Sequence, residues 1–211
     1  MTENNESTRK TWNKFAKPYA ELFMELDWYN ASYTHFCDLL KQKSSVLELA
    51  CGPGNITRFL ANYRPDLKLL ATDSADEMLK QAVHIAPSAT LMQLDCTAFP
   101  NIENKFDGIL AGFLLPYLNQ NQWLTLLQDC AKNLNPAGVV YFSAIEGNYS
   151  DSRNEWNSEK TDALFVHYYS EAYLLETLAQ NGFKPLKTYR VAYEKSSGLC
   201  ETHLVILARK T

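Results

Sequence analysis

The chain has 211 residues, of which 46% are hydrophobic and 21% charged, and its 20 basic and 24 acidic side chains give a formal net charge of -4. These fractions exclude a largely disordered chain. The acidic balance argues against nonspecific binding to nucleic acid or to an anionic membrane surface. The length predicts a single domain, residues 1–211.

The five cysteines are odd in number and scattered, and no Cys-x-x-Cys pair occurs. This pattern is typical of a reducing compartment and offers no spacing suited to a metal. The polar amino-terminal segment lacks the apolar stretch of a secretory signal, and the longest apolar run, residues 108–118, is too short to span a bilayer. We therefore expect a cytoplasmic monomer or homodimer that binds no metal, no membrane and no nucleic acid.

The first 40 residues predict a helical cap, because aromatic and aliphatic side chains recur at helical spacing from Trp12 to Leu26. A short buried strand is expected at residues 45–50, ending in a glycine turn. Asn55 is expected to cap a helix that runs to about Tyr63.

After this turn, apolar runs typical of strands alternate with segments of helical periodicity. Strands joined through helices imply right-handed crossovers and a parallel sheet with helices on both faces. The expected strands are residues 67–72, 89–94, 106–111 and 139–145, with helices at 75–85 and 123–134.

The carboxy-terminal part has a different pattern. Residues 146–169 show little periodicity and predict a long loop or lid over the core at 45–145. Ser170 is expected to cap a helix that ends at Asn181-Gly182. Two strands, residues 186–193 and 201–208, are separated by a short polar turn, so they must pair antiparallel.

The strongest local signal is the strand that runs through Glu48 into the turn containing Gly52 and Gly54. Glycine removes the Cβ where the backbone turns sharply and where a ligand approaches closely. The third position of the dinucleotide-binding fingerprint holds Thr57, which does not favour a bound pyrophosphate.

Two carboxylates follow at the ends of the next strands. Asp73 lies about 20 residues after the turn, where a carboxylate can accept hydrogen bonds from both hydroxyls of a ribose. Asp95 can accept a hydrogen bond from an exocyclic adenine amine. Each could instead be an ordinary turn or capping residue.

In order and spacing, these motifs make the sequence resemble the class I S-adenosylmethionine-dependent methyltransferases from Trp12 to Arg209. The matching segments are the glycine turn with Glu48, residues 72–79, Asp95-Cys96, residues 106–110 and the strand hairpin after Gly182-Phe183. The resemblance implies a Rossmann-like α/β fold. Its seven-stranded, mostly parallel sheet would end in an antiparallel carboxy-terminal hairpin.

The resemblance implies S-adenosylmethionine as cofactor. The turn from Ala50 through Gly52 to Gly54 would hold its methionine portion, with Glu48 tethering the turn or contacting the ammonium group. Ala111, at the end of strand four, would lie near the methionine tail.

Its adenosine portion would bind to the second and third motifs. Asp73 would hold the ribose, with Ser74 and Met78 against the adenosine, and Asp95 and Cys96 would meet the adenine edge.

A further contact comes from the amino-terminal segment, which resembles one that closes over the cofactor in small-molecule members. Tyr19 in this segment would bind the methionine carboxylate, or it could be a packed helix aromatic.

Methyl transfer mainly requires that a nucleophile be held in line with the activated methyl group. A general base is needed only when the acceptor arrives protonated. Tyr117 and His167 are the expected catalytic residues, with Glu146 and Tyr168 as further candidates. Many relatives carry a histidine near the end of strand four, and this chain has Tyr117 there, which leaves the base open.

The acceptor is expected to be a small molecule. Residues 112–117 lack the Asn/Asp-Pro-Pro-Tyr/Phe motif of amino-methylating nucleic-acid enzymes, and the aromatic lid suits a planar or partly apolar ligand. Two alternatives stay open: a nicotinamide-dependent oxidoreductase on a similar sheet, and a non-catalytic protein that binds S-adenosylmethionine and acts through partners.

Overall fold

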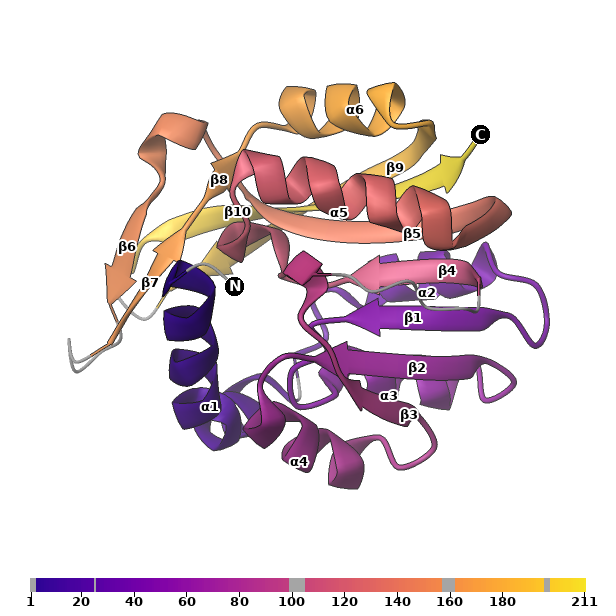
Figure 1. Cartoon of the computed structure of the whole chain (residues 1–211), viewed down its shortest axis with the longest axis horizontal. Coiled ribbons are helices and arrows are strands. Elements are labelled where there is room, and N and C mark those ends of the chain that lie inside the picture. Colours follow the sequence, from indigo (N-terminus) through magenta and orange to yellow (C-terminus); the bar gives the residue numbers. More distant parts are fainter. Residues whose placement is uncertain (1–2, 25, 99–104, 157–161, 196–197) are drawn as a thin grey trace.

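The structure is a computed structural model that describes residues 3–24, 26–98, 105–156, 162–195 and 198–211. Its main sheet has the strand order β3-β2-β1-β4-β5-β10-β9, with β8 paired to β5 outside this path (Figure 1). Strands β1 to β5 and β8 are parallel to one another, and β10 pairs antiparallel with both β5 and β9. The predicted α/β fold with an antiparallel carboxy-terminal hairpin is confirmed. The strands are β1 (Ser45–Leu49), β2 (Lys68–Asp73), β3 (Thr90–Gln93), β4 (Phe106–Ala111), β5 (Leu134–Glu146), β8 (Tyr168–Tyr169), β9 (Phe183–Glu194) and β10 (Cys200–Lys210).

Helices cover both faces of this sheet, which is why its central strands are almost continuously apolar. Successive side chains point to opposite faces, and so Val46 packs with the helices on one face and Leu47 with those on the other. In Figure 1, α5 and α6 lie on the near face, and α2 and α3 lie behind the sheet. The helices are α2 (Asn30–Asp38), α3 (Asn55–Tyr63), α4 (Asp76–Ile85), α5 (Gln120–Asn133) and α6 (Glu171–Gln180).

The first 40 residues form two helices, not one continuous cap. Helix α1 (Glu3–Phe23) stands across the end of the sheet to which β1, β2 and β4 point (Figure 1). It is held there by Ala16, which packs against Ala75, the N-cap of α4, and Met78 in its first turn. Helix α2 instead packs on the same face of the sheet as α3. None of the helices in the described residues is long and apolar enough to cross a membrane.

One of the two predicted helix N-caps is present in the structure, and the other is not. Ser170 caps α6 by accepting a hydrogen bond from the Tyr173 amide, as predicted. The prediction that Asn55 caps α3 is wrong: the N-cap is Gly54 in the left-handed conformation, and the side-chain Nδ2 of Asn55 donates instead to the carbonyl of Phe23 at 2.8 Å. The nearby α1 end supplies an acceptor that the sequence could not indicate.

The predicted loop between β5 and α6 contains regular structure. Strands β6 (Arg153–Trp156) and β7 (Ala163–Val166) form a separate antiparallel pair, and β8 then joins the main sheet. Four-residue strands are too short to show a clear alternation, so the periodicity of the sequence did not reveal them. Residues 157–161 of the predicted lid lie outside the described residues.

Candidate active site

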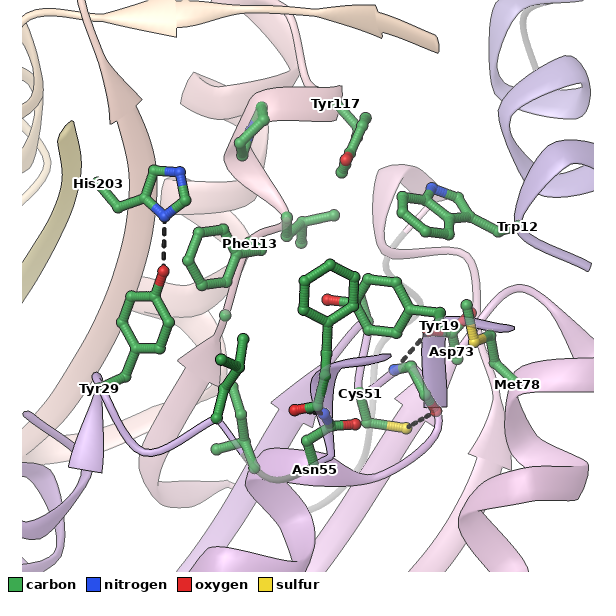
Figure 2. Close-up of a pocket in the computed structure, with 18 of the residues that line it drawn as sticks. Trp12, Tyr19, Tyr29, Cys51, Asn55, Asp73, Met78, Phe113, Tyr117 and His203 are labelled. Atoms are coloured by element: carbon green, nitrogen blue, oxygen red, sulfur yellow. Dashed lines mark hydrogen bonds between the residues drawn. The ribbon is translucent and has the colours of Figure 1, made fainter. Parts of the chain in front are cut away.

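A cavity of about 850 Å³ lies where the carboxyl ends of β1, β2 and β4 meet α1. Ligands of open α/β sheets bind at this end of the strands, and ligand pockets typically measure ~300–1,000 Å³. Figure 2 shows two sides of the cavity: Trp12, Tyr19 and Asp73 face it on one side, and Tyr29 and His203 on the other. The cavity is large enough to hold two compact ligands side by side.

The turn after β1 is built around unusual backbone. Ala50 has φ of 51° and Gly52 has φ of 56°, both in the left-handed region. A Cβ on Gly52 would meet no atom within 4 Å, so this residue presents open backbone to the cavity. Phe113, just after β4, has φ of 55° and also lines the cavity. Strained backbone of this kind is found where the surrounding fold fixes it, commonly at functional sites.

Asp73 joins this turn to the end of β2. Its Oδ2 accepts a hydrogen bond from the Gly52 amide at 2.9 Å, and its Oδ1 accepts one from the Ala75 amide at 2.8 Å. Burial raises the pKa of Asp73, although these amide donors oppose the shift. Each carboxylate oxygen retains lone-pair capacity for a ligand hydroxyl.

The structure gathers most of the predicted cofactor residues around one cavity. Asp95 also accepts hydrogen bonds from the amide and hydroxyl of Thr97 at 2.9 and 2.6 Å, which fix the turn after β3. The predicted residues that line the cavity are Tyr19, Ala50, Gly52, Asp73, Ser74, Met78, Asp95 and Cys96.

Three predicted cofactor residues are absent from the lining. Glu48 is buried behind the turn, where its Oε2 accepts a hydrogen bond from the Thr57 hydroxyl at 2.7 Å. Gly54 allows α3 to approach α4, because a Cβ there would lie 3.3 Å from the Cβ of Ala82. Ala111 is fully buried in the core. These three residues lie behind the cavity wall and support its backbone.

Only one of the two expected catalytic residues lines the cavity. Tyr117 lines the cavity with its ring 5.3 Å from that of Trp12, and burial raises its pKa well above the ordinary value. His167 does not line the cavity: its amide donates to the carbonyl of Pro116 at 2.7 Å, and its ring stacks on Tyr149 at 5.3 Å. This packing does not support a catalytic role for His167.

Sequence reasoning missed the residues at the far side of the cavity. The Tyr29 hydroxyl lies 2.6 Å from Nδ1 of His203, whose ring stacks on Tyr193 at 4.8 Å and meets the edge of Phe113 at 4.9 Å. A signal was present, because Glu201 and His203 are polar and two positions apart, and therefore on one face of a strand that continues as the apolar run 204–208.

Charged groups close this side of the cavity. The Lys195 ammonium lies 2.6 Å from carboxylate oxygens of both Glu155 and Glu201, and the Tyr168 hydroxyl is 2.6 Å from Oε1 of Glu201. Burial alone would raise the pKa of Glu201, but His203, Lys195 and Tyr168 together lower it to about 2. Glu201 is therefore ionised at neutral pH. Within the described residues, no group of His, Cys, Asp and Glu is arranged to hold a metal.

Known proteins resemble this chain in sequence and in fold. Residues 46–138 match the family model described as a methyltransferase domain. Trans-aconitate 2-methyltransferase from Azoarcus sp. is 33% identical over 101 residues, which cover 48% of this chain and 39% of that protein. Carboxy-S-adenosyl-L-methionine synthase from Campylobacter jejuni is 30% identical over 110 residues, which cover 50% and 46%. The chain thus spans less than half the length of these curated relatives.

A solved structure resembles the whole chain. It is the Burkholderia thailandensis 1,6-didemethyltoxoflavin-N1-methyltransferase with bound 1,6-didemethyltoxoflavin and S-adenosylhomocysteine, with a TM-score of 0.75 and 20% identity, covering 100% of this chain and 92% of that one. At this identity the likeness concerns the fold. The comparisons therefore identify residues 46–138 of this chain as similar to a methyltransferase domain.

Proposed function

We propose that this protein transfers a methyl group from S-adenosylmethionine to a small-molecule acceptor. The observation that carries the proposal is the open backbone of Gly52, which Asp73 holds at the edge of a cavity large enough for donor and acceptor together. A dinucleotide would need the same turn to hold a pyrophosphate, and Thr57, in the third fingerprint position, is buried and bonded to Glu48.

The methyl donor suits the side of the cavity formed by the turn and α1. Ala50 and Gly52 would hold the methionine portion, with Tyr19 available for its carboxylate, and Asp73 would hold the ribose. The adenosine would lie against Ser74, Met78, Asp95 and Cys96. Glu48 would act on the turn from behind, since its bond to Thr57 favours tethering over contact with the ammonium group.

The acceptor would occupy the aromatic side of the cavity, between α2 and the β9–β10 hairpin. A nucleic acid does not suit this site, because the described lining has more carboxylates than cations. The carboxylates are Asp27, Asp73, Asp95, Glu155 and Glu201, and the cations are Arg9, Arg58 and Lys195.

Different parts of the chain would bind the methyl donor and the acceptor. Residues 45–145 would bind the donor, and residues 1–40 and 146–169 would shape the acceptor side. The protein would act as a monomer or a homodimer. The five free cysteines support a cytoplasmic location.

Catalysis would come mainly from alignment of the acceptor with the methyl group. Tyr117 would contribute as a neutral hydrogen-bonding phenol, because burial disfavours its ionised form. His167 would support the wall behind Pro116 and take no part in the chemistry.

Calorimetry with S-adenosylmethionine, S-adenosylhomocysteine and NAD tests the donor. We expect binding of the first two and none of NAD; the reverse preference would overturn the assignment. Release of S-adenosylhomocysteine across a panel of metabolites, with trans-aconitate and small amines, phenols and acids included, then tests turnover. Binding without release for every compound would favour the non-catalytic alternative.

A further inference from the structure

Three side chains on the acceptor side of the cavity form a chain of polar contacts. The Tyr29 hydroxyl lies 2.6 Å from Nδ1 of His203, and Nε2 of the same ring lies 3.9 Å from Oε2 of Glu201. Tyr29 is 5% exposed, His203 is 6% exposed and the Glu201 side chain is 9% exposed, yet all three line the cavity. Tyr29 precedes α2, and the other two residues share one face of β10.

Only one of the two Glu201 carboxylate oxygens has hydrogen-bond partners. Its Oε1 contacts Tyr168 and Lys195 at 2.6 Å, while its Oε2 is buried and has no hydrogen-bond partner. At 3.9 Å, Nε2 of His203 is beyond hydrogen-bond range of this oxygen, and a small movement would bring the two within it. A buried carboxylate oxygen without a donor is costly, and the imidazole can supply one.

The Glu201 carboxylate favours one tautomer of the imidazole. An ionised carboxylate can only accept hydrogen bonds, so it favours a proton on Nε2 of His203. In the neutral ring Nδ1 is then the acceptor, and the Tyr29 hydroxyl must donate to it. The lone pairs of the Tyr29 oxygen remain available to a proton that arrives from the cavity.

We propose that Tyr29, His203 and Glu201 form a relay that takes the proton of the methyl acceptor. This inference rests on the proposed function. The acceptor atom forms its bond to the methyl carbon while the bond from that carbon to sulfur breaks and leaves its electron pair on sulfur. The acceptor's proton passes to the Tyr29 oxygen, and the proton of Tyr29 passes to Nδ1 of His203. The imidazolium is then paired with the Glu201 carboxylate.

The relay assigns separate roles to its members. Tyr29 is the catalytic residue that meets the acceptor, and His203 and Glu201 are positioning residues behind it. Such an arrangement suits acceptors whose nucleophile carries a dissociable proton, as in phenols, alcohols and amines, and is unnecessary for thioethers or tertiary amines.

The surroundings of His203 leave this relay intact. Tyr193 from β9 stacks on the ring, and Phe113 meets it by an edge. The residue paired with His203 on β5 is Ile145, and on β9 it is Val191, neither of which titrates. The charged side chains near Glu201 are Lys195, Arg153 and Glu155, and each forms an ion pair with Glu201 or with another member of this group.

A second histidine–tyrosine pair provides a matched control. Nδ1 of His35 lies 2.8 Å from the Tyr189 hydroxyl, but neither residue lines the cavity. His35→Asn and Tyr189→Phe remove the same groups as His203→Asn and Tyr29→Phe. Asparagine at 203 can still accept a hydrogen bond from Tyr29 but cannot take up a proton, which separates proton transfer from packing.

The kinetic test uses an acceptor identified in the metabolite panel and measures single turnovers with saturating donor. We expect Tyr29→Phe and His203→Asn to slow transfer by about 100-fold or more, with unchanged affinity for S-adenosylhomocysteine. The wild-type rate should fall on acidification, and His203→Asn should remove that dependence. Losses no larger than those of the control pair, or an unchanged pH profile, would overturn the relay.

A second test needs no acceptor. Nitrogen-15 spectra of the imidazole rings at neutral or mildly alkaline pH should show His203 with its proton on Nε2, and Glu201→Gln should shift the ring toward the other tautomer. A proton found on Nδ1 in the wild type, or no response to Glu201→Gln, would overturn the inference. Failure of S-adenosylhomocysteine to bind would instead count against the proposed function, and the spectra would still decide the relay.

Discussion

Asp73 and Gly52 are joined by a hydrogen bond of 2.9 Å from the glycine amide to Oδ2 of the carboxylate. This bond ties the turn after β1 to the end of β2, and both residues line the same cavity. The carboxylate that would bind the ribose therefore also shapes the turn that would bind the methionine portion. Substitution of Asp73 should therefore weaken the binding of both the ribose and the methionine portion of the donor.

Asp73→Asn tests this double role. The amide keeps the size of the side chain but turns one acceptor oxygen into a donor, which must face the Gly52 or the Ala75 amide. Loss of a hydrogen bond to a charged group costs about 1.5–3 kcal/mol, so affinity for S-adenosylhomocysteine should fall by roughly tenfold or more in calorimetry. Full affinity in this variant would show that the donor binds elsewhere.

The two glycines of the turn should separate ligand binding from stability. Gly52→Ala adds a methyl group into open space beside the donor, so we expect weaker donor binding and a modest stability loss from left-handed strain, about 1–2 kcal/mol. Gly54→Ala suffers comparable strain and also crowds Ala82 at 3.3 Å. It should be the less stable variant in urea unfolding. Equal effects of both variants on binding and stability would contradict this division.

The turn could be predicted because local sequence determines it. A buried strand, a glycine turn and a following carboxylate lie within 30 residues, and their spacing places them at the same edge of a parallel sheet. The antiparallel hairpin was predictable for the same reason, since a short turn between strands permits no other pairing. The short pair β6 and β7 gave no such signal.

The acceptor side could not be predicted in the same way. Tyr29 and His203 are 174 positions apart, and no local pattern relates them. Their contact depends on the position of β10 beside β5, which brings the last strand next to the segment before α2. The position of His167 could not be predicted for a similar reason, because its backbone bond to Pro116, which is distant in sequence, places it outside the cavity lining.

Tyr19→Phe tests the contact predicted between α1 and the donor. Burial, with smaller effects from Tyr193 and Asp73, raises the pKa of Tyr19 to about 12, so its hydroxyl is a neutral hydrogen-bond donor. The phenylalanine ring can keep the edge contact with Trp12 at 5.5 Å. We expect roughly tenfold weaker binding of S-adenosylhomocysteine with little change in Tm. Tyr173→Phe on α6 is the control, and equal affinities in both variants would remove Tyr19 from the donor site.

Glu48 should make the stability of the protein depend on pH. The side chain is buried, its Oε1 has no hydrogen-bond partner, and burial raises its pKa from 4.5 to about 8. A carboxyl whose pKa is raised by folding stabilises fully below its unfolded pKa, and that contribution is lost as pH rises through the folded pKa. The loss should approach about 1.4 kcal/mol per pH unit between the two values.

Glu48→Gln isolates this contribution, because the amide is neutral at every pH and can still accept the Thr57 hydrogen bond. The difference in unfolding free energy between variant and wild type should move in favour of the variant as the pH of urea titrations rises from about 5 to about 8. Glu21→Gln removes an exposed carboxylate of α1 and should leave that difference nearly constant. Parallel stability curves for Glu48→Gln and the wild type would mean that Glu48 is ionised in the folded protein, and that a cation not yet identified compensates its charge.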